Sequence, residues 1–182
     1  MAETPEEKVN MGSANDGRNI ILVGMMGTGK STVGQLLAQE LGFEFIDLDN
    51  AIVKREGRSI PEIFAENGES YFRVVETAEL QISLLGGGKV ISTGGGAVLA
   101  PGNTSVMLEN GCVIALTAAA EDIISRVAED KNRPLLAGNA EERVRRLMEE
   151  RRNAYLFAHY TVDTTGLRPA QVSEYILMQY RG

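Results

Sequence analysis

Short apolar runs and stretches of helical periodicity alternate along the chain. Residues 20–23 are all aliphatic and stop at Gly24, which is typical of a strand buried on both faces of a parallel sheet. From Ser31 the apolar positions recur every three or four residues until Gly42, a common helix end. The chain therefore begins with a predicted strand, a glycine-rich turn and an amphipathic helix.

The same two patterns repeat over the rest of the chain. Ser59 and Glu62 have the spacing of a capping box at the start of a short helix. Because strands alternate with helices, we predict an α/β protein, with a five-stranded parallel sheet in a three-layer α/β/α arrangement. The further strands are predicted at residues 43–46, 89–92, 112–116 and 160–163, and the further helices at 51–56, 61–64, 69–85, 119–128, 141–156 and 169–179.

Length and composition are those of one folded unit. The chain has 182 residues, of which 43% are hydrophobic, so it can bury a substantial core. We expect a single domain over residues 18–182, preceded by a flexible polar tail at 1–17. A polar segment at residues 129–140, which contains Pro134 and Gly138, is predicted to be a mobile loop.

Charge and rare residues exclude several classes of function. The formal net charge of −7 argues against a nucleic-acid partner. The chain has one cysteine, Cys112, and one histidine, His159. It therefore cannot form an intramolecular disulfide or a cysteine- or histidine-rich metal site, and both residues are interpreted as structural. No apolar run has the ~20 residues of a membrane span, and the first residues lack a signal-peptide pattern. We therefore expect a cytoplasmic protein without a membrane partner.

The strongest motif is the octapeptide Gly-Met-Met-Gly-Thr-Gly-Lys-Ser at residues 24–31, the phosphate loop, which lies between a predicted strand and a predicted helix. Its glycines allow backbone N–H groups to converge on phosphate oxygens, and the following helix adds its positive dipole end. In such a loop Lys30 reaches the terminal phosphates and the hydroxyl of Ser31 ligates Mg²⁺. The predicted ATP-binding residues of this segment are Gly27, Thr28, Gly29, Lys30, Ser31 and Thr32.

Acidic residues follow the second predicted strand. Asp47 and Asp49 stand at its carboxyl end, where open α/β sheets bind ligands, and residues two apart on a strand point the same way. One carboxylate could serve the water shell of a metal ion while the other faces a substrate hydroxyl, although aspartate is also a favoured helix N-cap. Ser92 and Thr93 end the third strand, where phosphate-loop proteins often carry a metal-shell acid. Asp47 is therefore the candidate for that task.

Glycines and arginines supply the other candidates. The glycines at residues 94–96 directly follow the third strand and would let a ligand approach the backbone closely. Arg73 is either a carboxylate-binding fork or one partner of an exposed pair with Glu76. Arg133, in the predicted loop, is either a cation that closes over phosphates or a solvated loop residue.

Taken together, these residues resemble those of the shikimate kinases, a family of the nucleoside-monophosphate-kinase-like group with a phosphate-loop kinase fold. The likeness runs from about residue 19 to residue 180. The phosphate loop is common to many kinases, whereas the order and spacing of Asp49, Arg73, Gly95 and Arg151 are far more specific. The other matching segments are 47–49, 57–60, 63–64, 68–69, 72–76, 93–98 and 133–136.

The resemblance implies a role for each candidate. Asp49 would hydrogen-bond the accepting hydroxyl, as a base or as an orienting group, and Asp47 would bind Mg²⁺ through water. Arg133 matches a lid arginine over phosphate and substrate, and Arg126 matches the side chain that flanks adenine. The catalytic candidates are thus Lys30, Asp49 and Arg133. The residues implied around shikimate are Asp49, Arg73, Gly94, Gly95, Gly96 and Arg151, with Phe64, Phe72 and Glu76 lining or supporting the pocket.

One segment departs from the family pattern. The family usually has Arg-x-Pro-Leu-Tyr where this chain has Arg151, Arg152, Asn153, Ala154 and Tyr155. The spacing to Tyr155 favours Arg151 as the arginine that binds the substrate carboxylate, and Arg152 is the alternative.

The resemblance implies ATP-dependent phosphorylation of the 3-hydroxyl of shikimate, on the route to chorismate and the aromatic amino acids. It implies ATP and Mg²⁺ as cofactors, a substrate-binding helical segment at about 49–76 and a lid at about 129–140. We expect a monomer. The alternatives are another small-molecule kinase of this fold, acting on gluconate or a nucleoside monophosphate, and a non-catalytic nucleotide-binding regulator.

Overall fold

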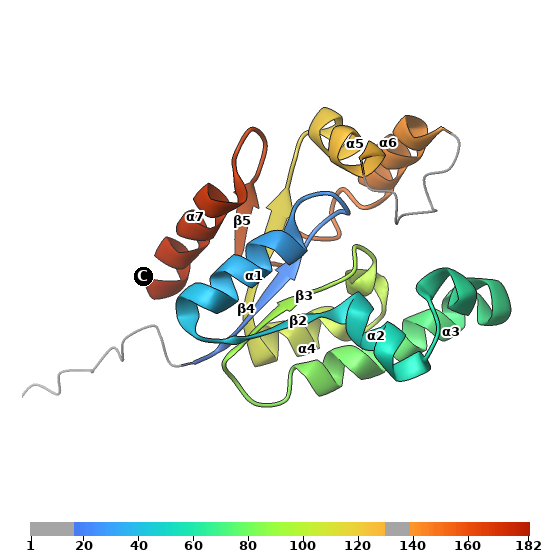
Figure 1. The fold of residues 1–182 in the computed structure, drawn as a ribbon, viewed down its shortest axis with the longest axis horizontal. Helices are drawn as coiled ribbons and strands as arrows, with labels where there is room; N and C mark the ends of the chain where they lie inside the picture. The colour runs from blue at the N-terminus through green and yellow to red at the C-terminus, as the bar shows by residue number, and fades with distance from the viewer. Residues whose placement is uncertain (1–16, 130–138) are drawn as a thin grey trace, which may run out of the picture.

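The strands form one parallel sheet with helices on both of its faces (Figure 1). The computed structural model describes residues 17–129 and 139–182. The strand order is β2-β3-β1-β4-β5, so the central strand is β1. This sheet confirms the predicted five-stranded parallel α/β architecture. The strands are β1 (Asn19–Val23), β2 (Glu44–Asp47), β3 (Lys89–Ser92), β4 (Gly111–Thr117) and β5 (Tyr160–Asp163).

Two apolar clusters cover the two faces of the sheet. Along β1, Ile20 and Leu22 belong to the cluster that also contains α1 and α7 side chains, whereas Ile21 and Val23 belong to the opposite cluster. This alternation explains why the run at 20–23 has no polar position. The first cluster lies under α1 (Lys30–Leu41) and α7 (Pro169–Arg181). The second lies under α2 (Leu48–Glu56), α3 (Ile60–Ser83), α4 (Asn103–Asn110), α5 (Ala120–Ala128) and α6 (Ala140–Glu150).

The segment at about 49–76, which the family resemblance implies as substrate-binding, contains α2 and most of α3. The predicted capping box is confirmed, since Ser59 N–H donates to Glu62 at 2.7 Å and Glu62 N–H donates to the Ser59 hydroxyl at 3.3 Å. The helices predicted at 61–64 and 69–85 are joined in α3, across a non-helical Gly68 with φ 81° and ψ 174°. Only glycine readily adopts this backbone conformation, so the two parts of α3 meet at a kink.

Two helix boundaries differ from the prediction, and one helix was not predicted. The helix predicted at 51–56 already begins at Leu48, and the helix predicted at 141–156 ends at Glu150. Helix α4 was not predicted, because Asn103 and Met107 are its buried residues and two positions make no recognisable apolar stripe. No helix within the described ranges is long and apolar enough to cross a bilayer.

Candidate active site

The phosphate loop wraps around the side chain of Lys30. The Lys30 ammonium donates to the carbonyls of Gly24 at 2.8 Å and Met25 at 2.7 Å, and only 8% of Lys30 is exposed. In a planar trans peptide the N–H points opposite to the C=O, so the amides of these peptide units face away from the ammonium. The loop therefore presents backbone N–H groups to an anion on that other side.

The backbone conformation favours glycine at two positions of the phosphate loop. Gly27 has φ 74° and Gly29 has φ 91°, both in the left-handed region that favours glycine. Thr28 is buried between them, and its hydroxyl donates to the Met25 carbonyl at 2.8 Å. Thr32, one turn into α1, is exposed. The sequence-predicted nucleotide residues of this segment therefore form one continuous loop and helix start.

Three oxygen-bearing side chains meet beside the loop. The sheet register pairs Asp47 with Ser92, at the carboxyl ends of β2 and β3. The Ser31 hydroxyl donates to Asp47 Oδ2 at 2.7 Å and lies 3.3 Å from the Ser92 hydroxyl. Hydroxyl and carboxylate oxygens are the hard ligands that Mg²⁺ prefers, so this donor set fits Mg²⁺. Asp47 is also the N-cap of α2, because its Oδ1 accepts from Asn50 N–H at 3.1 Å.

The expectation that Asp47 and Asp49 point the same way along a strand is wrong. Asp47 ends β2 and starts α2 at once, so Asp49 lies in the first turn of that helix. A Cβ atom placed on Gly94 would lie 3.1 Å from Asp49 Oδ1 and 3.2 Å from Glu76 Oε2. Asp47 therefore faces the phosphate loop, whereas Asp49 faces the turn after β3.

The turn at Gly94, Gly95 and Gly96 is enclosed by charged side chains. A Cβ on Gly95 would lie 3.1 Å from Arg151 Nη1, and a Cβ on Gly96 would lie 2.7 Å from Arg73 Nη1. None of the three glycines has a positive φ, so backbone conformation does not require glycine here. The requirement is space, because any side chain would displace Asp49, Glu76 or one of the two arginines.

Glu76 is a buried carboxylate that holds Arg73. The two side chains meet at 2.7 Å. Glu76 is 1% exposed and the Arg73 side chain 20%, so the pair is partly buried rather than fully exposed as one sequence interpretation had it. Burial raises the pKa of Glu76, and nearby Asp49 raises it further, while Arg73 and Arg151 oppose the shift. Arg73 also lies 5.3 Å from the centre of the Phe72 ring, which packs against Phe64 at 4.8 Å between ring centres.

The turn after α6 brings Arg151, and not Arg152, to the site. Arg152 points to solvent, where it pairs with Glu149 at 3.5 Å and its side chain is 71% exposed. The hydroxyl of buried Tyr155 donates to the Gly95 carbonyl at 2.7 Å, which ties this turn to the glycine turn. Burial raises the pKa of Tyr155, and Arg151 opposes this shift. Arg151, Arg152 and Tyr155 all line a cavity of about 410 Å³ with residues of the phosphate loop and α5, so it is the contact with the glycine turn that distinguishes Arg151.

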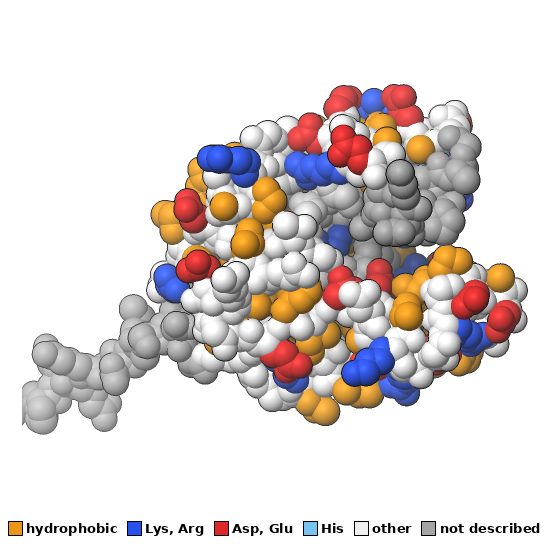
Figure 2. All heavy atoms as spheres, viewed as in Figure 1, with side chains coloured by type: hydrophobic (Ala, Val, Ile, Leu, Met, Phe, Trp, Pro, Cys, Tyr) orange, Lys and Arg blue, Asp and Glu red, His pale blue; other side chains and the backbone are white. Residues whose placement is uncertain are grey.

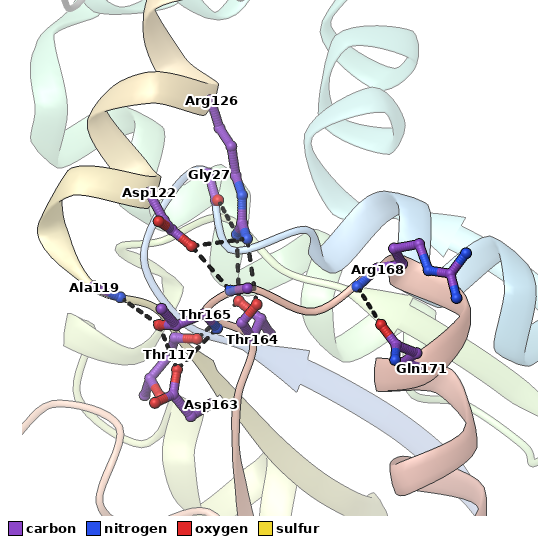
Figure 3. A network of polar contacts seen from close by, with 11 residues as sticks. Gly27, Thr117, Ala119, Asp122, Arg126, Asp163, Thr164, Thr165, Arg168 and Gln171 are labelled. Atoms are coloured by element: carbon purple, nitrogen blue, oxygen red, sulfur yellow. Dashed lines mark hydrogen bonds and ion pairs between the residues drawn. The ribbon is translucent and has the colours of Figure 1, made fainter.

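Arg126 joins three elements that are distant in the sequence (Figure 3). From α5, its Nη1 donates to the Gly27 carbonyl at 3.0 Å and to the Thr164 hydroxyl at 3.2 Å. Its Nη2 donates to the Thr164 carbonyl at 3.3 Å. The guanidinium therefore connects the back of the phosphate loop to the segment after β5.

The arrangement leaves a hollow between two parts of the surface. Figure 2 shows this face indented between the region of α2 and α3 and the region of α5 and α6, with acidic and basic side chains inside. Arg133 and most of the predicted loop at 129–140 lie outside the described residues. Thr164 and Asp122, which contact the Arg126 network, were missed in the sequence. Nothing local marks Thr164, and an acid in the first turn of α5 has the pattern of an ordinary helix start.

Comparison with known proteins identifies a family with this site. A model of the shikimate kinase family matches residues 26–181. A shikimate kinase of Geobacter sulfurreducens is 51% identical over 160 residues, which are 86% of this chain and 87% of that protein. A shikimate kinase of Persephonella marina is 45% identical over 164 residues, or 90% of this chain and 99% of that protein.

Solved structures agree with this result. The shikimate kinase of Acinetobacter baumannii, determined in complex with shikimate, has a TM-score of 0.85 and 40% identity over 89% of this chain and 92% of its own. A gluconokinase of Sinorhizobium meliloti has a TM-score of 0.59 and 16% identity over 90% of this chain and 91% of its own. The second likeness shows the fold alone.

We expect the carboxyl group of Glu76 to titrate above its ordinary pKa of 4.5, because burial outweighs the attraction of Arg73. In Arg73→Met the pKa should rise further, since the opposing positive charge is gone. Carboxyl-detected NMR titrations of both proteins measure these shifts. A Glu76 midpoint at or below the ordinary value, or a lower midpoint in Arg73→Met, would contradict this electrostatic account.

The raised pKa of Glu76 also determines whether this group stabilises or destabilises the folded chain as pH rises. The unfolded chain releases this proton at lower pH than the folded chain, so this group makes the free energy of unfolding fall as pH rises from 4.5 through the raised pKa. Glu76→Gln should lack that fall, which urea denaturation across the same pH range tests.

Proposed function

The chain belongs to the shikimate kinase family, and from this premise we propose how its residues transfer the γ-phosphoryl group of ATP to the 3-hydroxyl of shikimate. The enzyme is an ATP-dependent kinase of the aromatic amino-acid pathway. The observation that carries the proposed site is the convergence of Asp49, Arg73 and Arg151 on the turn at 94–96, next to the phosphate loop. A hydroxyl-facing acid beside two cations suits an acceptor that carries both an alcohol and a carboxylate.

The phosphate loop holds the nucleotide. Backbone amides of residues 27–29 bind the phosphates. The Lys30 ammonium, which donates to the Gly24 and Met25 carbonyls in this structure, turns to the transferred group and stabilises the charge that develops there. Ser31 and, through water, Asp47 would hold Mg²⁺, which supplies charge neutralisation for the β- and γ-phosphates when it is bound. Arg126 flanks the adenine ring. Its contacts with Gly27 and Thr164 support this role, because they keep the guanidinium beside the loop.

Asp49 acts at the accepting hydroxyl. Its position in the first turn of α2, against Gly94, aims the carboxylate at the same turn as the two arginines. The carboxylate accepts a hydrogen bond from the 3-hydroxyl and orients its oxygen toward the γ-phosphorus. It receives the proton as the new P–O bond forms, while the bond from the γ-phosphorus to the β,γ-bridging oxygen breaks and ADP leaves. This is general-base assistance within hydrogen-bond reach.

Arg73 and Arg151 bind the substrate carboxylate from two sides. A planar guanidinium matches a carboxylate through paired N–H donors, and here each arginine is oriented before substrate arrives. Glu76 orients Arg73, and the Tyr155 contact with Gly95 positions the turn against Arg151. The backbone of Gly94, Gly95 and Gly96 supplies the surface on which the ring of the substrate rests.

Arg133 completes the proposed catalytic set from the lid at about 129–140, and the segment at about 49–76 binds shikimate. Water exclusion by such a lid would prevent loss of the phosphoryl group to solvent. We place this reaction in the cytoplasm and in a monomer. One domain over residues 18–182 carries it, after the tail at 1–17.

A coupled assay of ADP release tests the function against its alternatives. With ATP and Mg²⁺, shikimate should give ADP well above background, whereas gluconate and nucleoside monophosphates should not. Lys30→Met is the background control, because removal of the ammonium takes away a fixed partner of the transferred phosphoryl group. ADP release with another acceptor but not with shikimate would reject the specificity. Nucleotide binding without ADP release for any acceptor would favour a regulator.

Arg151→Ala should raise the KM for shikimate by about tenfold or more, because a charge-assisted carboxylate contact is lost. The KM for ATP should stay within about twofold. Arg152→Ala is the matched control, and its exposed pair with Glu149 predicts kinetics close to wild type. Steady-state kinetics that show equal losses for both substrates, or a larger effect of Arg152→Ala, would reject Arg151 as the carboxylate ligand.

Gly96→Ala should fold normally, because φ −99° suits alanine. Its Cβ would lie 2.7 Å from Arg73 Nη1, so the guanidinium must move away from the turn. We expect a KM for shikimate that is about tenfold higher and a KM for ATP close to wild type. Kinetics and thermal denaturation measure the two effects, and an unchanged KM for shikimate would show that Arg73 does not bind this substrate.

A further inference from the structure

We propose that Asp122 is a positioning residue for the purine ring of ATP, acting through one carboxylate oxygen that contacts both Arg126 and the segment after β5. The proposal rests on the proposed place of adenine beside Arg126. Asp122 itself touches neither phosphate nor base in this arrangement. Figure 3 shows its side chain directed from α5 toward Arg126 and the segment after β5.

The geometry at Asp122 is defined by two contacts of one atom. Oδ2 accepts from Gly166 N–H at 3.2 Å and lies 3.6 Å from Arg126 Nη2. Gly166 has φ 69°, a left-handed turn in the segment that follows β5. The same oxygen therefore links the bend of this segment, through a hydrogen bond, to one edge of the guanidinium, through an ion pair.

The contacts of Arg126 suit stacking against a flat ring. All guanidinium N–H groups lie in the plane of the group, and those that contact Gly27, Thr164 and Asp122 hold that plane in place. Its faces are not used by these in-plane contacts. A fixed guanidinium plane stacks on an aromatic ring at less entropic loss than a mobile one.

Other contacts hold the segment after β5 in place. Thr164 N–H and its hydroxyl both donate to the Thr117 carbonyl, at 2.8 and 2.9 Å. The Thr165 hydroxyl accepts from Ala119 N–H at 2.8 Å and donates to Asp163 at 2.7 Å. The segment is thus joined to the start of α5 up to Thr165. Asp122 extends this connection to Gly166, where the chain turns.

Glu121 provides a matched control that tests whether Asp122 has a purely structural role. Asp122 and Glu121 both lie in the first turn of α5, where either charge stabilises the helix dipole. Glu121 pairs with Arg145 at 3.1 Å, away from Arg126. Glu121→Gln therefore removes one first-turn charge without touching the two contacts of Asp122.

The experiment compares two ligands that differ in the base. Calorimetry with ADP and with inorganic tripolyphosphate, each with Mg²⁺, measures affinity for wild type, Asp122→Ala, Asp122→Asn and Glu121→Gln. Asp122→Ala should weaken ADP binding about fivefold, which is about 1 kcal/mol and the net contribution of one hydrogen bond. Asp122→Asn, which keeps an acceptor oxygen but loses the charge, should weaken it less. Tripolyphosphate binding by these variants, and ADP binding by Glu121→Gln, should stay within about twofold of wild type.

Three results would overturn the proposal. They are unchanged ADP affinity in both Asp122 variants, an equal loss of ADP and tripolyphosphate affinity, and an ADP loss in Glu121→Gln as large as in Asp122→Ala. Circular dichroism checks the fold, and Asp122→Asn decides the question if the alanine variant does not fold. Because no acceptor is present, this comparison stands even if wild type fails to phosphorylate shikimate.

Discussion

Parallel pairing of β2, β3 and β1 is the constraint on which the site depends. It places the carboxyl ends of three strands at one edge, where Asp47 pairs with Ser92 and Ser92 pairs with Leu22 in the register. The phosphate loop, the start of α2 and the turn at 94–96 all leave the sheet there. Nucleotide and acceptor are thereby held against neighbouring strands, and a shift in the register would separate the residues that meet around Ser31.

Glycine serves two different physical purposes at this edge. In the phosphate loop, Gly27 and Gly29 adopt left-handed φ values, so that backbone amides can turn toward an anion. In the turn at 94–96 the φ values are ordinary, and glycine is required because charged side chains of α2, α3 and the turn after α6 occupy the surrounding space. The first arrangement suits any nucleotide, whereas the second would shape the proposed site for one acceptor.

The contact between buried Glu76 and Arg73 would make the proposed acceptor site rigid. Burial opposes the charge on Glu76, and the two arginines nearby offset this effect. Arg73 is therefore oriented by a 2.7 Å contact before any substrate binds. Preorganised donors need little rearrangement when a carboxylate arrives, which favours binding of an acidic acceptor over a neutral one.

The sequence by itself determined the order of the strands and of the helices other than α4, the phosphate loop and the family, because each depends on local spacing or on a motif read along the chain. Tertiary structure decided that Asp49 faces Gly94, that Arg151 rather than Arg152 reaches Gly95, and that α4 exists. It also decided the contacts of Arg126 with Gly27 and Thr164, residues far apart in the chain. Such contacts depend on how whole helices pack on the sheet, and no local pattern of residues encodes that geometry.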